Sequence, residues 1–164
     1  MSKLELLIGT IASGKSTYSR QRSKQGAIII NDDALVTALH GGYYNLYNKD
    51  LKPLYKSVEQ SIMIHCILSG VDVVIDRPNL TKASRAKYLA IAKAMDIEVA
   101  QVIFPFQEPK VHALRRMGDN TRGYSFEHWL NVAKDHIGRY EPPEVDEGHD
   151  YIMQIEVRPP KHDK

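Results

Sequence analysis

Residues 9–16 of the 164-residue chain read Gly-Thr-Ile-Ala-Ser-Gly-Lys-Ser. Two glycines separated by four residues and followed by lysine and serine match the P-loop spacing at every fixed position. The apolar run at residues 4–8 predicts a buried strand before the loop, and residues 15–22 continue after it as a helix. Strand, glycine loop and helix in this order are the context that confirms the motif.

The P-loop residues predict a site for the phosphates of a nucleoside triphosphate. Gly9 and Gly14 allow backbone angles and close approaches that a Cβ would block. The loop amides and the first turn of the helix then point towards an anion. Lys15 can reach the β- and γ-phosphates, and Ser16 can offer its hydroxyl to Mg²⁺. We therefore assign ATP and Mg²⁺ binding to this loop, with contacts from Gly9, Thr10, Ala12, Ser13, Gly14, Lys15, Ser16 and Thr17.

Length and composition indicate one ordinary globular domain over residues 1–164, with a polar, frayed tail at about 158–164. Hydrophobic residues make up 43% of the chain and charged residues 26%. The formal net charge of +2 does not demand a nucleic-acid partner. The single cysteine, Cys66, excludes an intrachain disulfide and is expected to be a small buried side chain. We find no signal peptide and no membrane-spanning run, so we expect a cytoplasmic protein.

Alternating apolar runs and helical patterns predict the architecture. Besides residues 4–8, the predicted strands are 27–30, 71–76, 98–104 and 150–155. Helical patterns follow at 34–39, 50–69, 81–95, 111–117 and 125–137. Thr81 is the predicted N-cap of the helix at 81–95, and Ser125 is that of the helix at 125–137. This alternation predicts a three-layer α/β P-loop NTPase or kinase fold with a mostly parallel, about five-stranded sheet.

Acidic side chains follow two of the predicted strands. Asp32 and Asp33 come at the end of the second strand, where ligands gather in open α/β sheets. One of the two acids can cap the next helix, which leaves the other for chemistry. Asp76 ends the third strand, as in a Walker B strand whose Asp holds Mg²⁺ directly or through water. We therefore predict a metal site at Ser16 and Asp76.

Basic residues gather in two segments. Residues 115–123 hold three arginines and two glycines with little apolar content. This composition predicts a mobile lid whose arginines neutralise a phosphoryl group in transfer, with an arginine-rich surface loop as the alternative. Lys82, Arg85 and Lys87 lie in the first two turns of the helix at 81–95. They face either a phosphate-rich ligand or solvent.

Four blocks of sequence resemble the kinase domain of phage polynucleotide kinase and its relatives, which are small phosphotransferases built like nucleoside monophosphate kinases. The blocks occur in the family's order over roughly residues 4–140, and they are 9–17, 30–33, 74–80 with Arg85 downstream, and 115–123. The resemblance implies transfer of the γ-phosphate of ATP to a hydroxyl of a nucleic acid, typically a 5′-OH end of DNA or RNA.

The resemblance also implies roles for individual residues. Asp32 matches the family's general base, which accepts the proton of the attacking hydroxyl. Asp76 matches the family's acid near the metal or the acceptor. Arg116 or Arg122 matches the catalytic lid arginine, with Arg115 as a third candidate. If a phage encodes the chain, the implied compartment is the host cytoplasm.

Two departures from the family's pattern concern the acceptor. No arginine occurs at 34–37, where the family grips the acceptor's phosphate, and residues 76–79 read Asp-Arg-Pro-Asn instead of Asp-x-Thr-Asn. Arg77 is a candidate replacement for the missing grip. The glycine- and tyrosine-rich loop at 40–48 either stacks on a base or sugar or packs as a surface loop. The candidate substrate-binding residues are therefore Asp33, Arg77, Asn79, Arg85, Tyr43 and Tyr44.

Several acceptors stay open at this point. A 5′-OH end, a hydroxymethylated base within phage DNA, and a nucleoside, nucleotide, sugar or antibiotic all present an alcohol to the same geometry. The weak net charge and the missing arginine favour a small molecule. A P-loop NTPase switch is the alternative of another class, although no obvious water-positioning glutamine or glutamate follows Asp76. The sequence indicates neither the acceptor nor the oligomeric state.

Overall fold

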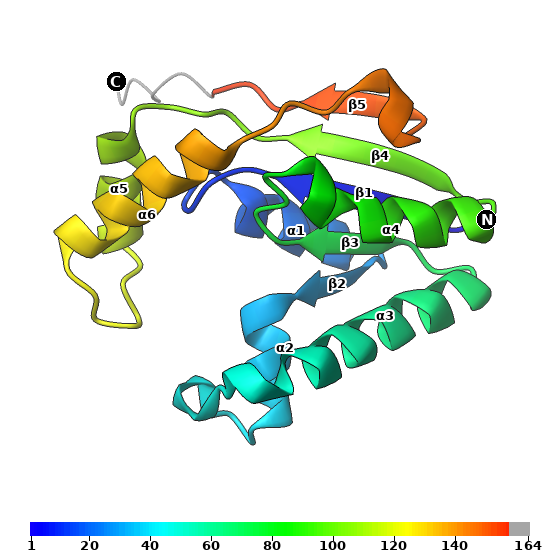
Figure 1. Ribbon diagram of the computed structural model, residues 1–164, viewed down its shortest axis with the longest axis horizontal. Helices are drawn as coiled ribbons and strands as arrows, with labels where there is room; N and C mark the ends of the chain where they lie inside the picture. The colour runs from blue at the N-terminus through cyan, green and yellow to red at the C-terminus, as the bar shows by residue number, and fades with distance from the viewer. Residues whose placement is uncertain (158–164) are drawn as a thin grey trace.

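A computed structural model describes residues 1–157, and a parallel five-stranded sheet forms its centre (Figure 1). The strand order is β2-β3-β1-β4-β5, and each neighbouring pair is parallel. The strands are β1 (Lys3–Ile8), β2 (Ile28–Asn31), β3 (Val73–Asp76), β4 (Glu98–Ile103) and β5 (Tyr151–Gln154). The predicted fold class is confirmed. The tail predicted at 158–164 lies outside the described residues.

Helices follow the strands in the predicted alternation. They are α1 (Lys15–Lys24), α2 (Asp32–Leu39), α3 (Lys52–Leu68), α4 (Lys82–Ala94), α5 (Pro109–Met117) and α6 (Phe126–Arg139). Short 3₁₀ turns occupy Tyr44–Leu46, Lys49–Leu51 and Val145–Glu147. Helices α5 and α6 pack against each other at one end of the molecule, and α2 lies apart from them beneath the sheet (Figure 1).

Apolar side chains cover both faces of the sheet. Leu6 belongs to the core cluster beneath α3 and α4, whereas its neighbour Leu7 belongs to the cluster beneath α1. Successive side chains of a strand point to opposite faces, so a strand buried on both sides is a continuous apolar run. Cys66 is only half-buried at the edge of the first cluster, and burial raises the pKa of its thiol. Among residues 1–157, no helix has the length and hydropathy to cross a bilayer.

Asn31 caps α2, so the prediction that Asp32 or Asp33 does so is wrong. The Asn31 side chain accepts a hydrogen bond of 3.0 Å from the amide of Ala34, and the helix begins at Asp32. Both acids therefore lie in the first helical turn, where the positive end of the helix dipole favours negative charge. Neither the Asp32 nor the Asp33 carboxylate accepts the capping hydrogen bond. The caps predicted for the later helices are confirmed, at Thr81 and Ser125.

Candidate active site

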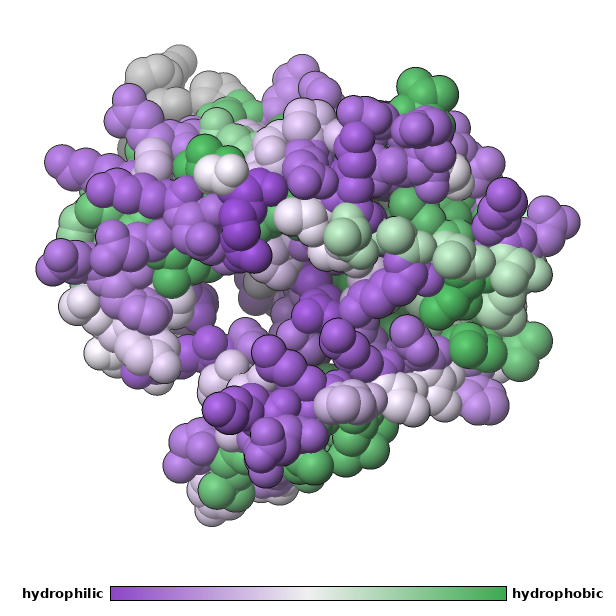
Figure 2. Space-filling view, in the orientation of Figure 1, coloured by the Kyte–Doolittle hydropathy of each residue, from purple (hydrophilic) through white to green (hydrophobic). Residues whose placement is uncertain are grey.

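A cleft of about 710 Å³ opens at the carboxyl ends of the strands. Figure 2 shows it as a hollow with a largely hydrophilic rim between the α5–α6 end of the molecule and the α2 region. Half of the predicted site residues line this one cleft: Ala12, Lys15, Ser16, Asp32, Asp33, Asp76, Arg77, Arg116 and Arg122. Residues more than a hundred positions apart in the chain therefore meet in a single site.

The P-loop has the backbone form that phosphate binding needs. A Cβ on Gly9 would lie 2.6 Å from the Ser13 Oγ and 3.0 Å from the Phe104 Cβ, and Gly14 has a φ of +105°. Both positions therefore require glycine. Within residues 1–157 the buried Ser13 hydroxyl has no hydrogen-bond partner. A narrow loop with an unused buried donor fits a bound anion.

The P-loop lysine is held against its own loop. The Lys15 ammonium donates hydrogen bonds to the carbonyl oxygens of Gly9, at 2.9 Å, and Thr10, at 2.6 Å. Burial lowers the pKa of Lys15 to about 8, and the negative charge of Asp76 opposes this shift. An incoming triphosphate would stabilise the charged form of the ammonium far better than loop carbonyls do.

Asp76 and Ser16 both line the cleft and can supply oxygen atoms to it. Asp76 is the last residue of β3 and pairs in register with Asn31 of β2, whose side-chain amide donates to the Asp76 carbonyl at 3.1 Å. Among the described residues, no group of three or more His, Cys, Asp and Glu surrounds a metal position. The arrangement fits Mg²⁺, which P-loop proteins bind through few protein ligands together with phosphate oxygens and water.

Asp32 faces the cleft from α2 and is paired with Arg77. The Arg77 Nη2 lies 2.9 Å from the Asp32 Oδ2, and its Nη1 lies 3.2 Å from both the Glu59 Oε2 and the Tyr88 hydroxyl. The Tyr88 hydroxyl in turn donates a short hydrogen bond to Glu59. Burial raises the pKa of Asp32, while Arg77 opposes the shift. Arg77 therefore has carboxylate partners where the sequence suggested an acceptor phosphate.

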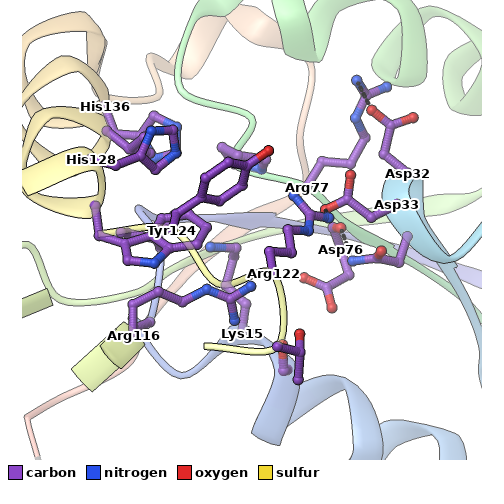
Figure 3. Close-up of a pocket in the computed structure, with 18 residues that line it drawn as sticks. Lys15, Asp32, Asp33, Asp76, Arg77, Arg116, Arg122, Tyr124, His128 and His136 are labelled. Atoms are coloured by element: carbon purple, nitrogen blue, oxygen red, sulfur yellow. Dashed lines mark hydrogen bonds and ion pairs between the residues drawn. The ribbon is translucent and has the colours of Figure 1, made fainter. Parts of the chain in front are cut away.

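The lid contacts the acid pair through Arg122. Arg122 Nη2 is 2.6 Å from the Asp33 Oδ2, and its guanidinium stacks 4.2 Å from the centre of the Tyr44 ring. Arg116, near the end of α5, lies 4.8 Å above the Trp129 ring. Figure 3 shows both arginines among the residues that line the cleft, together with Lys15 and Asp76. Arg115 instead lines smaller cavities beside the P-loop.

Four predicted substrate-binding residues, Asn79, Arg85, Tyr43 and Tyr44, do not line this cleft, which corrects their assignment to it. The buried Asn79 amide donates to the Leu7 carbonyl at 2.8 Å and fastens the loop after β3 to the sheet. Arg85 is fully buried, pairs with Glu147 at 2.8 Å and donates to backbone carbonyls, so its charge is already satisfied. Tyr43 is exposed outside the cleft, and Tyr44 reaches it only through Arg122.

The sequence argument missed an aromatic and histidine-bearing wall on the lid side of the cleft. Tyr124, His128, Val132 and His136 all line it, with Trp129 beside them. His128, Val132 and His136 are spaced by four residues within α6, and such positions share a helix face, which is the signal that would have found them; Tyr124 precedes the helix. Tyr124 stacks on His128 with ring centres 4.2 Å apart.

His136 links this wall to the P-loop. Its Nδ1 lies 3.1 Å from the Thr10 Oγ1, and burial together with the nearby Lys15 charge lowers its pKa to about 4. The ring is therefore neutral at physiological pH. A neutral ring beside the P-loop lysine adds no further positive charge to the loop.

A family model described as an AAA domain, AAA_33, matches residues 4–140. The chain belongs to this family. A comparison with curated protein sequences gave no match. The architecture of this AAA_33 chain, a parallel sheet whose first strand leads through a P-loop into a helix, is that of the P-loop kinases.

Solved structures share the fold of this AAA_33 chain at low identity. A chain of the Pnkp1/Rnl/Hen1 RNA repair complex aligns with a TM-score of 0.63 and 17% identity, covering 85% of this chain and 46% of that one. A gluconokinase from Sinorhizobium meliloti 1021 aligns with 0.60 and 19%, covering 96% and 84%. Kti12 of Chaetomium thermophilum, in complex with ADP-AlF3, aligns with 0.55 and 18%, covering 93% and 88%.

The AAA_33 chain spans less than half the length of the RNA-repair chains that it matches, 35% in one complex and 46% in the other. Sequence identities this low show a shared fold and nothing about a shared substrate. What the site acts on must therefore be argued from its own residues.

Proposed function

We propose that this chain is an ATP-dependent phosphotransferase that moves the γ-phosphate of ATP to a hydroxyl of a nucleic acid, with the 5′-OH end of DNA or RNA as the acceptor. The observation that carries the proposal is the position of Asp32, which lines the same cleft as Lys15 and Arg116 from the opposite side. A partly exposed carboxylate facing a phosphate site is suited to take the proton from an alcohol, which is a weak nucleophile.

The residues divide the reaction between them. Asp32 accepts the hydroxyl proton while the acceptor oxygen forms its bond to the γ-phosphorus and the bond to the β-phosphate oxygen breaks. Lys15 and Arg116 neutralise the charge that spreads over the phosphoryl oxygens. Mg²⁺, held by Ser16 and Asp76, would supply further positive charge at the phosphates.

Phosphate binding by the loop is supported by the fold as well as by its glycines. Kti12, which shares the fold, is described in complex with ADP-AlF3. The similarity to a chain of an RNA repair complex agrees with a nucleic-acid acceptor, although it covers less than half of that chain.

A small-molecule kinase is the second candidate. Two observations favour it: Arg77 is engaged by Asp32 and Glu59, and the chain covers 84% of a gluconokinase. A small alcohol such as a sugar or nucleoside would enter the same cleft and meet the same general base. The two candidates therefore differ in the acceptor and not in the chemistry.

The test is phosphate transfer from γ-labelled ATP in Mg²⁺ to a matched set of acceptors. The set contains 5′-OH DNA, 5′-OH RNA, duplex DNA with and without hydroxymethylated bases, gluconate and a nucleoside mixture. Label at the 5′ end of an oligonucleotide is the expected result. Label on gluconate or nucleosides alone supports the second candidate, and label only in free phosphate indicates an NTPase. Lys15→Ala should abolish transfer, whereas Lys24→Ala, at the exposed far end of the same helix, should not.

A further inference from the structure

A second cavity of about 230 Å³ adjoins the acceptor side of the cleft. Arg77 and Pro78 line both spaces, so the two lie on either side of these residues. The far wall of the second cavity comes from the first turns of α4 and the end of α6, and it includes Lys87 and Arg139. A ligand that reaches Asp32 and extends past Arg77 therefore enters this cavity.

The second cavity is lined by a cationic side chain, Lys87, that makes no ion pair with Asp32 or Asp33. Arg77, and not Lys87, makes the ion pairs with Asp32 and Glu59. The Lys87 ammonium lies 4.7 Å over the Tyr88 ring. Burial and the nearby Arg77 charge lower the pKa of Lys87, which means that its surroundings disfavour the cation. An oxyanion in the cavity would reverse that penalty.

The other cations of the cavity are less constrained. Arg139 pairs at 2.9 Å with Asp135, and both side chains are more than half exposed, so this ion pair is easily exchanged for a ligand. The hydroxyls of Thr81 and Ser84 are used in the capping box of α4. Arg77, Lys87 and Arg139 give this cavity three cationic side chains, which favours a charged ligand over a neutral sugar.

We infer that the second cavity binds a phosphate of the acceptor strand, the one next to the nucleotide whose hydroxyl reacts, with Lys87 as its principal contact. The inference rests on the proposed function and deepens it. The acceptor hydroxyl lies at Asp32 on one side of the Arg77 guanidinium, and the strand continues on the other side. This site also replaces the phosphate-gripping arginine that is absent from residues 34–37.

The test compares binding of the dinucleotide d(TpT), which has a 5′-OH and one phosphodiester, with binding of thymidine. Calorimetry gives the ratio of the two dissociation constants independently of phosphate transfer. We expect the wild-type protein to bind d(TpT) about tenfold more tightly, the gain of one charge-assisted phosphate contact. Lys87→Met keeps the apolar stem of the side chain and should remove most of this preference, whereas Lys87→Arg should keep it.

Lys93→Met is the matched control, because Lys93 lies at the exposed end of the same helix. It should leave the ratio at its wild-type value. An unchanged ratio in Lys87→Met, with the variant folded as judged by its melting temperature, would overturn the inference. Binding that depends on Lys87 without any transfer of label to d(TpT) would support the phosphate site and overturn the proposed function alone.

Discussion

The Arg77 guanidinium lies 2.9 Å from the Asp32 carboxylate and also contacts the buried Glu59. One guanidinium therefore fixes the proposed general base relative to α3, since Glu59 belongs to that helix. Tyr88 of α4 contacts both Arg77 and Glu59. Asp32 begins its helix at the edge of an open cleft, and this network limits where its carboxylate can point.

Replacing Arg77 by glutamine should shift the pH dependence of transfer. Asp32 acts as a base only when it is deprotonated, and the Arg77 charge stabilises that form. Without the guanidinium the pKa of Asp32 rises further, so the acid limb of kcat/KM should move to higher pH. The measurement is kcat/KM against pH for both proteins. A variant that loses activity equally at every pH would show that Arg77 only supports the structure.

The two adjacent acids should differ in their effect on transfer. Asp32→Asn should lower kcat by about 10²–10⁴-fold, the usual contribution of a general base, with little change in ATP affinity. Asp33→Asn should cost less than tenfold, because it removes only a partly exposed ion pair with Arg122. Transfer kinetics and ATP titration separate the two effects. A larger loss in Asp33→Asn would assign the base to Asp33.

The sequence was sufficient for the parts of the fold that depend on local pattern. Strands β1 and β3 are buried on both faces, so each is a short apolar run, and the P-loop spacing fixes the turn between β1 and α1. The same reasoning brought Lys15, Asp32 and Asp76 to one edge of the sheet, since the carboxyl ends of parallel strands meet there. These positions follow from periodicity and strand direction alone.

Sequence patterns do not predict which residues form ion pairs with long charged side chains. Arg85 was assigned to the substrate, yet it pairs with Glu147, which lies 62 residues away. Asn31 and Asp32 are both good capping residues, and only the helix start decides between them. Arg77 contacts Glu59 because α3 packs beside the end of β3, a placement that no local pattern encodes. Tertiary contacts therefore decided which side chains reach the cleft.

The two lid arginines should contribute unequally, with Arg116 the more important. Arg116 lines both the main cleft and the cavity beside the P-loop, and its buried Nε has no partner among the described residues. Arg122 lies 2.6 Å from the Asp33 carboxylate, whereas the Arg116 guanidinium has only a looser ion pair of 3.8 Å with the exposed Asp119. We expect Arg116→Ala to lower kcat by about 10³-fold or more and Arg122→Ala by much less. Arg115→Ala is the control from the same helix, and small, equal losses in all three variants would contradict a catalytic lid.

His136 should make the protein less stable in mild acid. Its pKa is lowered from 6.5 to about 4 in the folded chain, so below pH 6.5 the unfolded chain binds a proton that the folded chain resists. Stability should therefore fall as the pH drops from 6.5 towards 4. His136→Gln removes this contribution and should make the fall shallower, as measured by denaturant unfolding at both ends of that range. The stability of His65→Gln, a variant at an exposed site on α3, should fall as steeply as that of the wild type. If the stability of the His136 variant also falls as steeply, burial does not lower the pKa of the ring beside Thr10.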